Sequence, residues 1–285
     1  MLLIQILANG VLLGGLYGLM ALGMALVWGV LNVVNLAHGA LIMLGGYVVY
    51  YLFTGFGIDP FLALPIAAVV MFVIGYLLQR FILNLIVRSA MLNTLLITFG
   101  LNVVITYLAQ LLFSADFRTI NPSYAGTNYN VFGITVPLVS LAAFVIAFAL
   151  AGAVWFVLNR LSLGRAIRAT AQNLTAARLY GVDPRGIYAV TFGIGAALAG
   201  VSGGLFGVLT HLTPYVGAAL TAKSFVIAII GGLSNPFNVI LGGIVVGIAE
   251  QLASLYLGPT YIDVISFGLL VVILIVRPAR SLRAA

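Results

Sequence analysis

The run PLVSLAAFVIAFALAGAVWFVL, residues 137–158, decides what kind of protein this is. It contains no charged side chain, and an apolar helix of about 20 residues is long enough to cross the hydrocarbon core of a bilayer. Similar runs recur near residues 6–28, 33–53, 61–79, 91–113, 188–209, 218–233, 238–257 and 261–276. The sequence therefore predicts an all-α integral membrane protein, a polytopic helical bundle of about eight or nine transmembrane segments that forms a single domain over residues 1–285. The count stays open because the run 218–233 is short and the joint at 29–35 is tight.

The composition of the whole chain agrees with this interpretation. Of its 285 residues, 64% are hydrophobic and 6% are charged, whereas a soluble domain carries about 25% charged residues. The ten-residue alternation typical of membrane β-barrels is absent. The chain has no cysteine, which excludes disulfides, thiolate zinc sites and cysteine nucleophiles.

The positions of the basic residues predict the orientation of the chain in the membrane. The net charge is +7, and the arginines lie in connections between apolar runs, so topology explains them better than a nucleic-acid partner. Arg80 and Arg88 flank one such connection, residues 159–187 form a second, and further arginines follow residue 276. With nine spans, all three groups fall on the cytoplasmic side. We therefore expect a cytoplasmic C-terminus, an external N-terminus and an external loop at 114–136.

The connection 159–187 is the most polar part of the chain. Its residues 162–173 have the pattern of an amphipathic helix, with Ile167 on the apolar face. Asn173 or Thr175 can cap a second short helix, and Gly181 suits the position just past its end. From these residues alone, the insert is either an amphipathic connector held by anionic lipid or a docking element for a cytoplasmic partner.

The segment TAARLYG, residues 175–181, resembles the EAA loop of ABC-importer permeases, a short helix that docks on an ATPase subunit. Ala176, Ala177 and Gly181 match that pattern, whereas Thr175 replaces its glutamate and the downstream Ile-x-Leu-Pro is missing.

Three longer stretches carry a more specific resemblance. They read NLAHGALIMLGGY (35–47), GRAIRATAQNLTAARLYGV (164–182) and PYVGAALTAKSFVIAIIGGLSNPFNVILGGIVVGIAE (214–250). In order and spacing they resemble the permease subunits of branched-chain amino-acid ABC importers. The compact length is similar to the smaller, H-type of the two paired permeases.

This resemblance implies a multi-pass protein of the bacterial cytoplasmic (inner) membrane that works in a heteromeric complex. The implied partners are a second permease subunit, two cytoplasmic ATPase subunits and an external substrate-binding protein. ATP and magnesium are then used by the ATPase subunits, and no cofactor, metal or nucleic acid is expected on this chain. The implied ATPase-coupling residues are Gly164, Arg165, Arg168, Ala176, Ala177 and Gly181.

The chain itself lacks the means to hydrolyse ATP. Residues 217–224, GAALTAKS, superficially resemble a P-loop, but Ala222 stands where the glycine before the lysine must be, and no strand precedes the segment. His38 and His211 are isolated, and no metal cluster or catalytic triad is visible in the sequence. We therefore expect a transport subunit, not an enzyme.

Polar residues at membrane depth are the candidates for the translocation path, because they usually face a bundle interior or a wet cavity. They are Asn35, His38, Thr94, Thr98, Asn102, Lys223 and Glu250. Lys223 and Glu250 lie at similar depth, so we expect an ion pair that either fixes helix register or contacts substrate. Asn35 and His38 flank the tight joint and either satisfy broken backbone groups or line the path.

Thr94, Thr98 and Asn102 share one stripe of their span, and they either bond to their own helix or line the path.

The leading interpretation is a permease subunit of an ATP-driven importer of branched-chain or other hydrophobic amino acids. Two alternatives remain open: an importer of urea or short amides with the same architecture, and a self-sufficient secondary transporter or channel. The sequence leaves open the exact substrate and whether the permease pair is homomeric or heteromeric.

Overall fold

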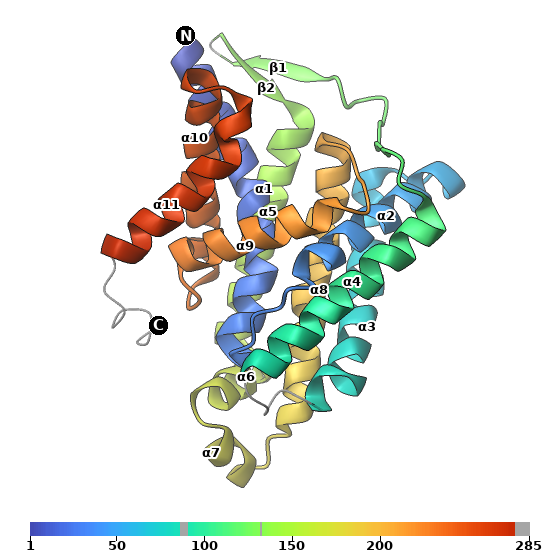
Figure 1. Ribbon diagram of the computed structural model, residues 1–285, viewed down its shortest axis with the longest axis vertical. Coiled ribbons are helices and arrows are strands. Elements are labelled where there is room, and N and C mark those ends of the chain that lie inside the picture. Colours follow the sequence, from blue (N-terminus) through green and yellow to red (C-terminus); the bar gives the residue numbers. More distant parts are fainter. Residues whose placement is uncertain (86–90, 132, 277–285) are drawn as a thin grey trace.

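The structure, a computed structural model, describes residues 1–85, 91–131 and 133–276 (Figure 1). Within these ranges the chain is almost entirely helical. The helices are α1 (Leu2–Leu31), α2 (His38–Phe56), α3 (Pro60–Phe81), α4 (Met91–Phe113), α5 (Leu138–Arg160), α6 (Ser162–Gln172), α7 (Leu174–Leu179), α8 (Pro184–Leu209), α9 (Val216–Gly231), α10 (Pro236–Tyr256) and α11 (Ile262–Val276), with short 3-10 turns η1 (Leu83–Leu85) and η2 (Pro259–Tyr261).

Seven helices of the described chain are long and apolar enough to cross a membrane: α1, α2, α3 with η1, α4, α5, α8 and α10. The predicted polytopic helical membrane protein is thereby confirmed. The last predicted run and the short run 218–233 also form helices, but α9 has 16 residues and α11 has 15. At 1.5 Å per residue these two helices are only about 23 Å long, which is less than a typical hydrocarbon core.

α1 and α8 form the buried centre of the bundle, and glycines let the surrounding helices approach them closely. Gly14 and Gly18 of α1 face Ile244 and Ile240 of α10, and a Cβ on either glycine would collide with the α10 backbone. Gly203 of α8 meets the backbone of α2 in the same way. Close backbone approach through small residues is a common way for membrane helices to associate.

One small feature departs from the predicted all-α architecture. Strands β1 (Asn128–Val131) and β2 (Ile134–Pro137) pair antiparallel inside the loop expected at 114–136. The glycine of the turn, Gly133, has φ of +82°, which glycine adopts readily. The Gln5 side chain accepts from the Thr135 N–H and donates to the Thr135 carbonyl, both at 2.7 Å, and so fastens the hairpin to the start of α1.

The two ends of the molecule are different in character. The hairpin and the start of α1 lie at one end, and α6 and α7 lie at the other (Figure 1). The two short helices expected in the insert 159–187 are therefore present, and the insert projects away from the hairpin. Asn173 caps α7 by accepting from the Ala176 N–H at 3.0 Å, as its sequence position predicts.

Candidate functional site

The connection between α1 and α2 is unwound inside the bundle. Asn32 closes α1 in the left-handed conformation with φ of 53°, and the next residues run without helical structure until His38. The His38 ring donates from Nε2 to the Met20 carbonyl at 2.8 Å, in a buried position. Met20 lies 11 residues before the end of α1 at Leu31, which corresponds to about 16 Å along the helix. The connection therefore returns into the bundle, and α2 begins beside the middle part of α1.

Side chains satisfy the backbone groups that this unwound connection exposes. Asn35 Oδ1 accepts from the Ala37 N–H at 3.0 Å, and Thr221 Oγ1 of α9 accepts from the Gly39 N–H at 2.8 Å. Both bonds stabilise the start of α2, whose first amides have no helical partner. Asn35 thus makes the bond expected of a residue that satisfies broken backbone groups, whereas the His38 side chain bonds a carbonyl inside the continuous helix α1.

Thr98 of α4 closes the other side of the connection. Its hydroxyl lies 3.0 Å from the carbonyl of Thr94, one turn earlier, and 3.4 Å from the carbonyl of Val34 in the unwound connection. The expected bond back to its own helix is present, and the second oxygen makes the hydroxyl a link between α4 and the connection. Thr94 and Thr98 are both buried.

A cavity of about 510 Å³ lies beside the unwound connection, bounded also by parts of α1, α4, α9 and α11. Its lining residues are Met24, Val34, Leu36, Leu95, Phe99, Asn102, Ala218, Thr221, Ala222, Phe225 and Phe267. Asn102 and Thr221 are the polar side chains among them, and Asn102 Oδ1 has no hydrogen-bond partner among the described residues. The volume is within the usual range of small-molecule pockets, about 300–1,000 Å³.

The structure brings only some of the predicted path residues to this cavity. Asn102 lines it, and Thr98 lies behind its wall through the bond to Val34. Asn35 and His38 are not among its lining residues. Thr221 was not predicted as a site residue, because a single threonine in an apolar run is equally typical of a bond to its own helix. That bond is also present: Thr221 Oγ1 lies 3.0 Å from the Gly217 carbonyl oxygen.

The predicted ion pair between α9 and α10 is confirmed. Lys223 Nζ lies 2.8 Å from Glu250 Oε1, and Glu250 is 2% exposed. Ser266 of α11 donates from Oγ to the same carboxylate, and Lys223 lies over the Tyr17 ring of α1, 4.4 Å from its centre. The pair thus ties four helices together. Neither of its members lines the cavity, which favours the register-fixing alternative over substrate contact.

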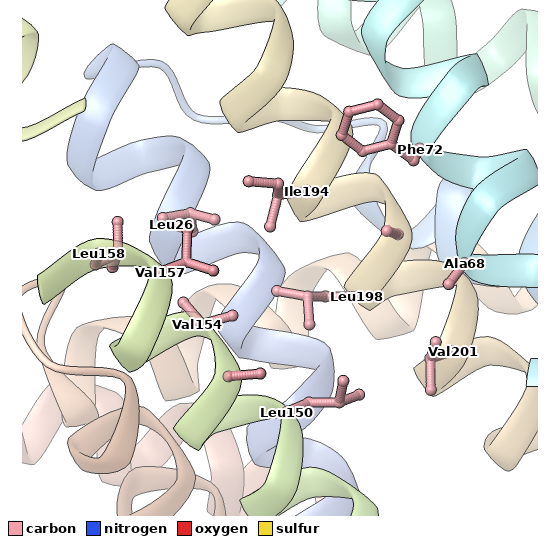
Figure 2. A pocket seen from close by; sticks show the side chains of 12 residues that line it. Leu26, Ala68, Phe72, Leu150, Val154, Val157, Leu158, Ile194, Leu198 and Val201 are labelled. Carbon is pink, nitrogen blue, oxygen red and sulfur yellow. The ribbon is translucent and has the colours of Figure 1, made fainter. Parts of the chain in front are cut away.

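A second cavity of about 230 Å³ is wholly apolar (Figure 2). It lies between α1, α3, α5 and α8, where Leu26, Phe72, Leu150 and Ile194 are among the lining side chains. A zwitterion placed there would leave both of its charges without partners, which is strongly unfavourable in an apolar surrounding. The cavity beside the unwound connection is therefore the better candidate for passage of an amino acid.

At the opposite end from the hairpin, the α6 half of the insert is anchored on the last turn of α5. A Cβ at Gly164 would collide with the carbonyls of Val157 and Leu158, so glycine is required for this close approach. Arg168 donates from Nη1 to the Leu158 carbonyl, one of the α5 carbonyls that has no partner within its own helix. Arg165 points to solvent.

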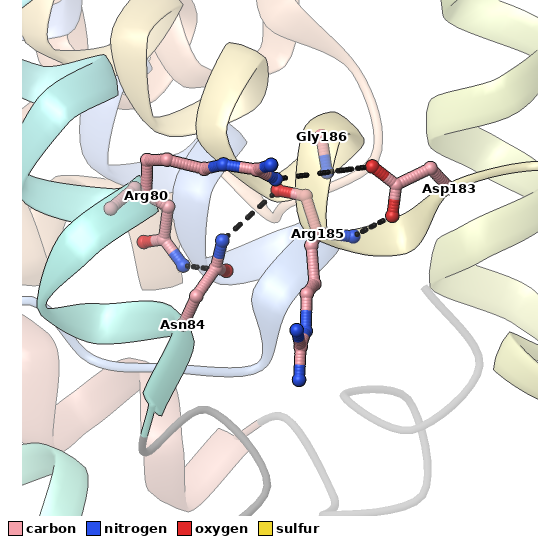
Figure 3. Close-up of polar contacts among 6 residues, drawn as sticks. Arg80, Asn84, Asp183, Arg185 and Gly186 are labelled. Atoms are coloured by element: carbon pink, nitrogen blue, oxygen red, sulfur yellow. Dashed lines mark hydrogen bonds and ion pairs between the residues drawn. The ribbon is translucent and has the colours of Figure 1, made fainter.

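The far end of the insert is joined to α3 (Figure 3). Asp183 caps α8 by accepting from the backbone N–H groups of Arg185 and Gly186, each at 3.0 Å, and lies 3.9 Å from Arg80 of α3. Asn84 donates to the Arg185 carbonyl at 3.2 Å. The insert is therefore connected to α5 at one end and to α3 and α8 at the other. Arg88 of the sequence analysis lies outside the described residues.

The remaining predicted coupling residues lie in and after α7. Ala177 is 3% exposed and faces inward, whereas Ala176 is half-buried. Gly181 follows the helix with φ of +80°, a left-handed conformation that glycine adopts readily.

The segment 217–224, which superficially resembles a P-loop, lies within the continuous helix Val216–Gly231. A helical segment cannot form a phosphate-binding loop, which agrees with the rejection of a P-loop from the sequence.

Comparison with known proteins agrees with this geometry. The family described as "Branched-chain amino acid transport system / permease component" matches residues 6–274. The chain is 31% identical to the high-affinity branched-chain amino acid transport system permease protein LivH of Escherichia coli (strain K12), and the alignment covers 96% of this chain and 94% of that protein.

Two further relatives mark the range of the similarity. The permease protein BraD of Pseudomonas aeruginosa is 30% identical over 96% of this chain and 94% of its own length. The permease protein LivM of Escherichia coli (strain K12) is 30% identical over 92% of this chain and 67% of its own length. No solved structure matches the chain. The chain belongs to the family of branched-chain amino acid transport permeases, the membrane-spanning components of ABC transport systems, and is a multi-pass membrane protein homologous to permeases of the bacterial inner membrane.

Proposed function

We propose that this chain is the permease subunit through which branched-chain amino acids cross the bacterial cytoplasmic membrane, delivered by an external substrate-binding protein and driven by ATP hydrolysis on partner subunits. The observation that carries this proposal is the unwound connection inside the bundle, beside a cavity with two polar lining side chains. Non-helical backbone inside a bilayer is tolerated where it is buried in protein or lines a cavity. In many transporters, broken helices of this kind form the substrate site.

The chemistry of the cavity suits a brief stay of a hydrophobic amino acid. Leu36, Phe99 and Phe225 offer apolar surface to an aliphatic side chain, and Asn102 and Thr221 offer hydrogen bonds. No charged side chain is among its lining residues, so a zwitterion gains little there relative to water. The cavity therefore serves passage, and substrate selection rests with the external protein.

The opposite ends of the molecule then face opposite sides of the membrane. The hairpin end faces the binding protein, and the insert end faces the cytoplasm, in line with the basic residues of the insert. In this orientation α9 and α11 complete a set of nine membrane segments, the N-terminus is external and the C-terminus cytoplasmic. Residues 277–285, with three arginines, lie outside the described chain.

Partners complete the transporter. A second permease, related to this chain as LivM-type relatives are, pairs with it, and one ATPase subunit docks on the insert of each permease. The coupling residues act in two ways. Gly164 and Arg168 seat α6 on α5, and Ala177 and Gly181 shape α7.

The experiment that tests the proposal is purification of the tagged chain from its native membrane in mild detergent, followed by reconstitution in liposomes. We expect a P-loop ATPase and a second permease to be recovered, and leucine uptake to require ATP, magnesium and the binding protein. Uptake of urea or a short amide in place of leucine would refute the proposed substrate but leave the proposed transporter architecture intact. Uptake by the chain alone without ATP would refute the proposal in favour of a channel or secondary carrier.

A further inference from the structure

The tip of the insert carries two large apolar side chains that nothing in the described chain covers. Leu179 is 83% exposed and Tyr180 is 89% exposed, at the end of α7. Along the long axis of the molecule, α7 is the described element farthest from the hairpin (Figure 1). Exposed apolar residues are expected on the lipid-facing surface of this protein, but α7 projects from the bundle end, where an adjacent pair of this size marks an interaction site.

The backbone holds this pair in one conformation. The Gly181 N–H donates to the Arg178 carbonyl at 2.9 Å, and the Val182 N–H donates to the Ala177 carbonyl at 3.0 Å. With Gly181 in the left-handed conformation, these bonds form a Schellman motif, which fixes the direction of the chain after a helix. A side chain presented from a fixed backbone loses less entropy on binding.

Ala177, the second alanine of the segment that resembles the EAA loop, cannot form part of the contact surface. Ala177 is 3% exposed, and α7 lies against α6 and α8. The motif residues therefore act as a scaffold. The exposed residues of α7 are Thr175, Arg178 and Leu179, followed by exposed Tyr180 at its C-cap; the large apolar ones are Leu179 and Tyr180, which the motif does not specify.

The charge around the pair indicates what kind of surface covers it. Arg165, Arg178 and Arg185 of the insert are exposed, and the acid nearest to them in sequence, Asp183, caps α8 and faces Arg80. The complementary surface is an apolar cleft with a carboxylate rim. A soluble protein domain can provide both, whereas a lipid surface would draw the whole length of α6 and α7 toward the headgroups.

We propose that Leu179 and Tyr180 are the anchor by which this permease holds its ATPase subunit, with the flanking arginines on the rim of the contact. This inference rests on the proposed function. Tyrosine is enriched among the few interface residues that dominate binding energy. Removal of either side chain should weaken ATPase binding at least about tenfold.

The test uses the permease pair in nanodiscs and measures the Kd of the purified ATPase subunit for wild type, Leu179→Ala, Tyr180→Ala and Tyr180→Phe. Leu85→Ala is the matched control, because Leu85 is 80% exposed in η1, outside the insert. All variants should keep the wild-type unfolding temperature within about 2 °C, since none of these side chains is packed.

We expect at least tenfold weaker binding for both α7 alanine variants, and near-wild-type binding for Tyr180→Phe and Leu85→Ala. An unchanged Kd in the α7 variants, as is also expected if α7 lies on lipid, overturns the anchor while leaving the proposed function intact. An equal loss in Leu85→Ala also overturns it. A wild-type pair that binds no ATPase at all overturns both the anchor and the proposed function.

Discussion

Replacing Glu250 alone should destabilise the protein more than replacing both members of its ion pair. In Glu250→Gln the side-chain size and an acceptor for Ser266 are kept, but the charge opposite Lys223 is lost. Leaving a buried charge without its partner destabilises a protein by roughly 3–5 kcal/mol. The Tyr17 ring, 4.4 Å from the ammonium, offsets about 1 kcal/mol of this. The expected loss is therefore about 2–4 kcal/mol.

The double variant Glu250→Gln with Lys223→Met removes both charges and keeps most of the lysine stem volume. Its loss should be below about 1.5 kcal/mol, as for other volume-conserving changes. Unfolding in detergent, followed by intrinsic fluorescence, measures both values. Asp116→Asn is the control, because the Asp116–Arg118 pair is exposed at 3.7 Å and contributes less than about 1 kcal/mol. Lys223→Met alone is measured in the same assay, and if the double variant loses as much as Glu250→Gln and Lys223→Met together, the ion-pair reasoning is wrong.

Three further substitutions test other parts of the account. Gly181→Val places a branched side chain at a position with φ of +80°, which strains the backbone by about 1–2 kcal/mol. The number of leucine molecules transported per ATP hydrolysed should therefore fall severalfold. An unchanged ratio would count against a role of α7 in coupling. Thr221→Val removes the acceptor for the Gly39 N–H and should destabilise by about 1–3 kcal/mol, whereas Thr221→Ser should stay near wild type in the same unfolding assay. Gly243→Leu places a side chain against the α1 backbone and should abolish the folded protein in a size-exclusion assay. Gly100→Leu is the control and should be tolerated, because nothing lies within 4 Å of a Cβ added there. Equal yields of the two variants would contradict the packing of α1 on α10.

The helical architecture was predictable because uncharged runs of bilayer length admit few other structures. The ion pair was predictable because an isolated charge in an apolar span is costly, and two opposite charges at similar depth lower that cost by pairing. The start of α2 was not predictable. The second apolar run was expected to begin at residue 33 and includes Val33 and Val34, whereas α1 ends at Leu31 and α2 begins only at His38. Hydropathy records which residues avoid water and not whether their backbone is helical.

The candidate site was predictable only in part. Asn102 could be placed on the correct stripe of its helix, but Thr221 comes from a helix far away in the sequence, and only the fold brings it to the unwound connection. Leu179 and Tyr180 escaped notice because an apolar pair is common in this composition. Their significance depends on their exposure at the tip of the insert, which sequence alone does not give.

The most direct test of the central claim is thiol modification of the cavity during transport. The chain has no cysteine, so Asn102→Cys introduces the single thiol of this subunit. In liposomes that contain the complete transporter, a thiol reagent should block ATP-driven leucine uptake by Asn102→Cys, and excess valine should slow that block. Leu150→Cys, in the wholly apolar cavity, is the control and should keep its uptake after labelling. Full labelling of Asn102→Cys with unchanged uptake would show that leucine does not pass through this cavity.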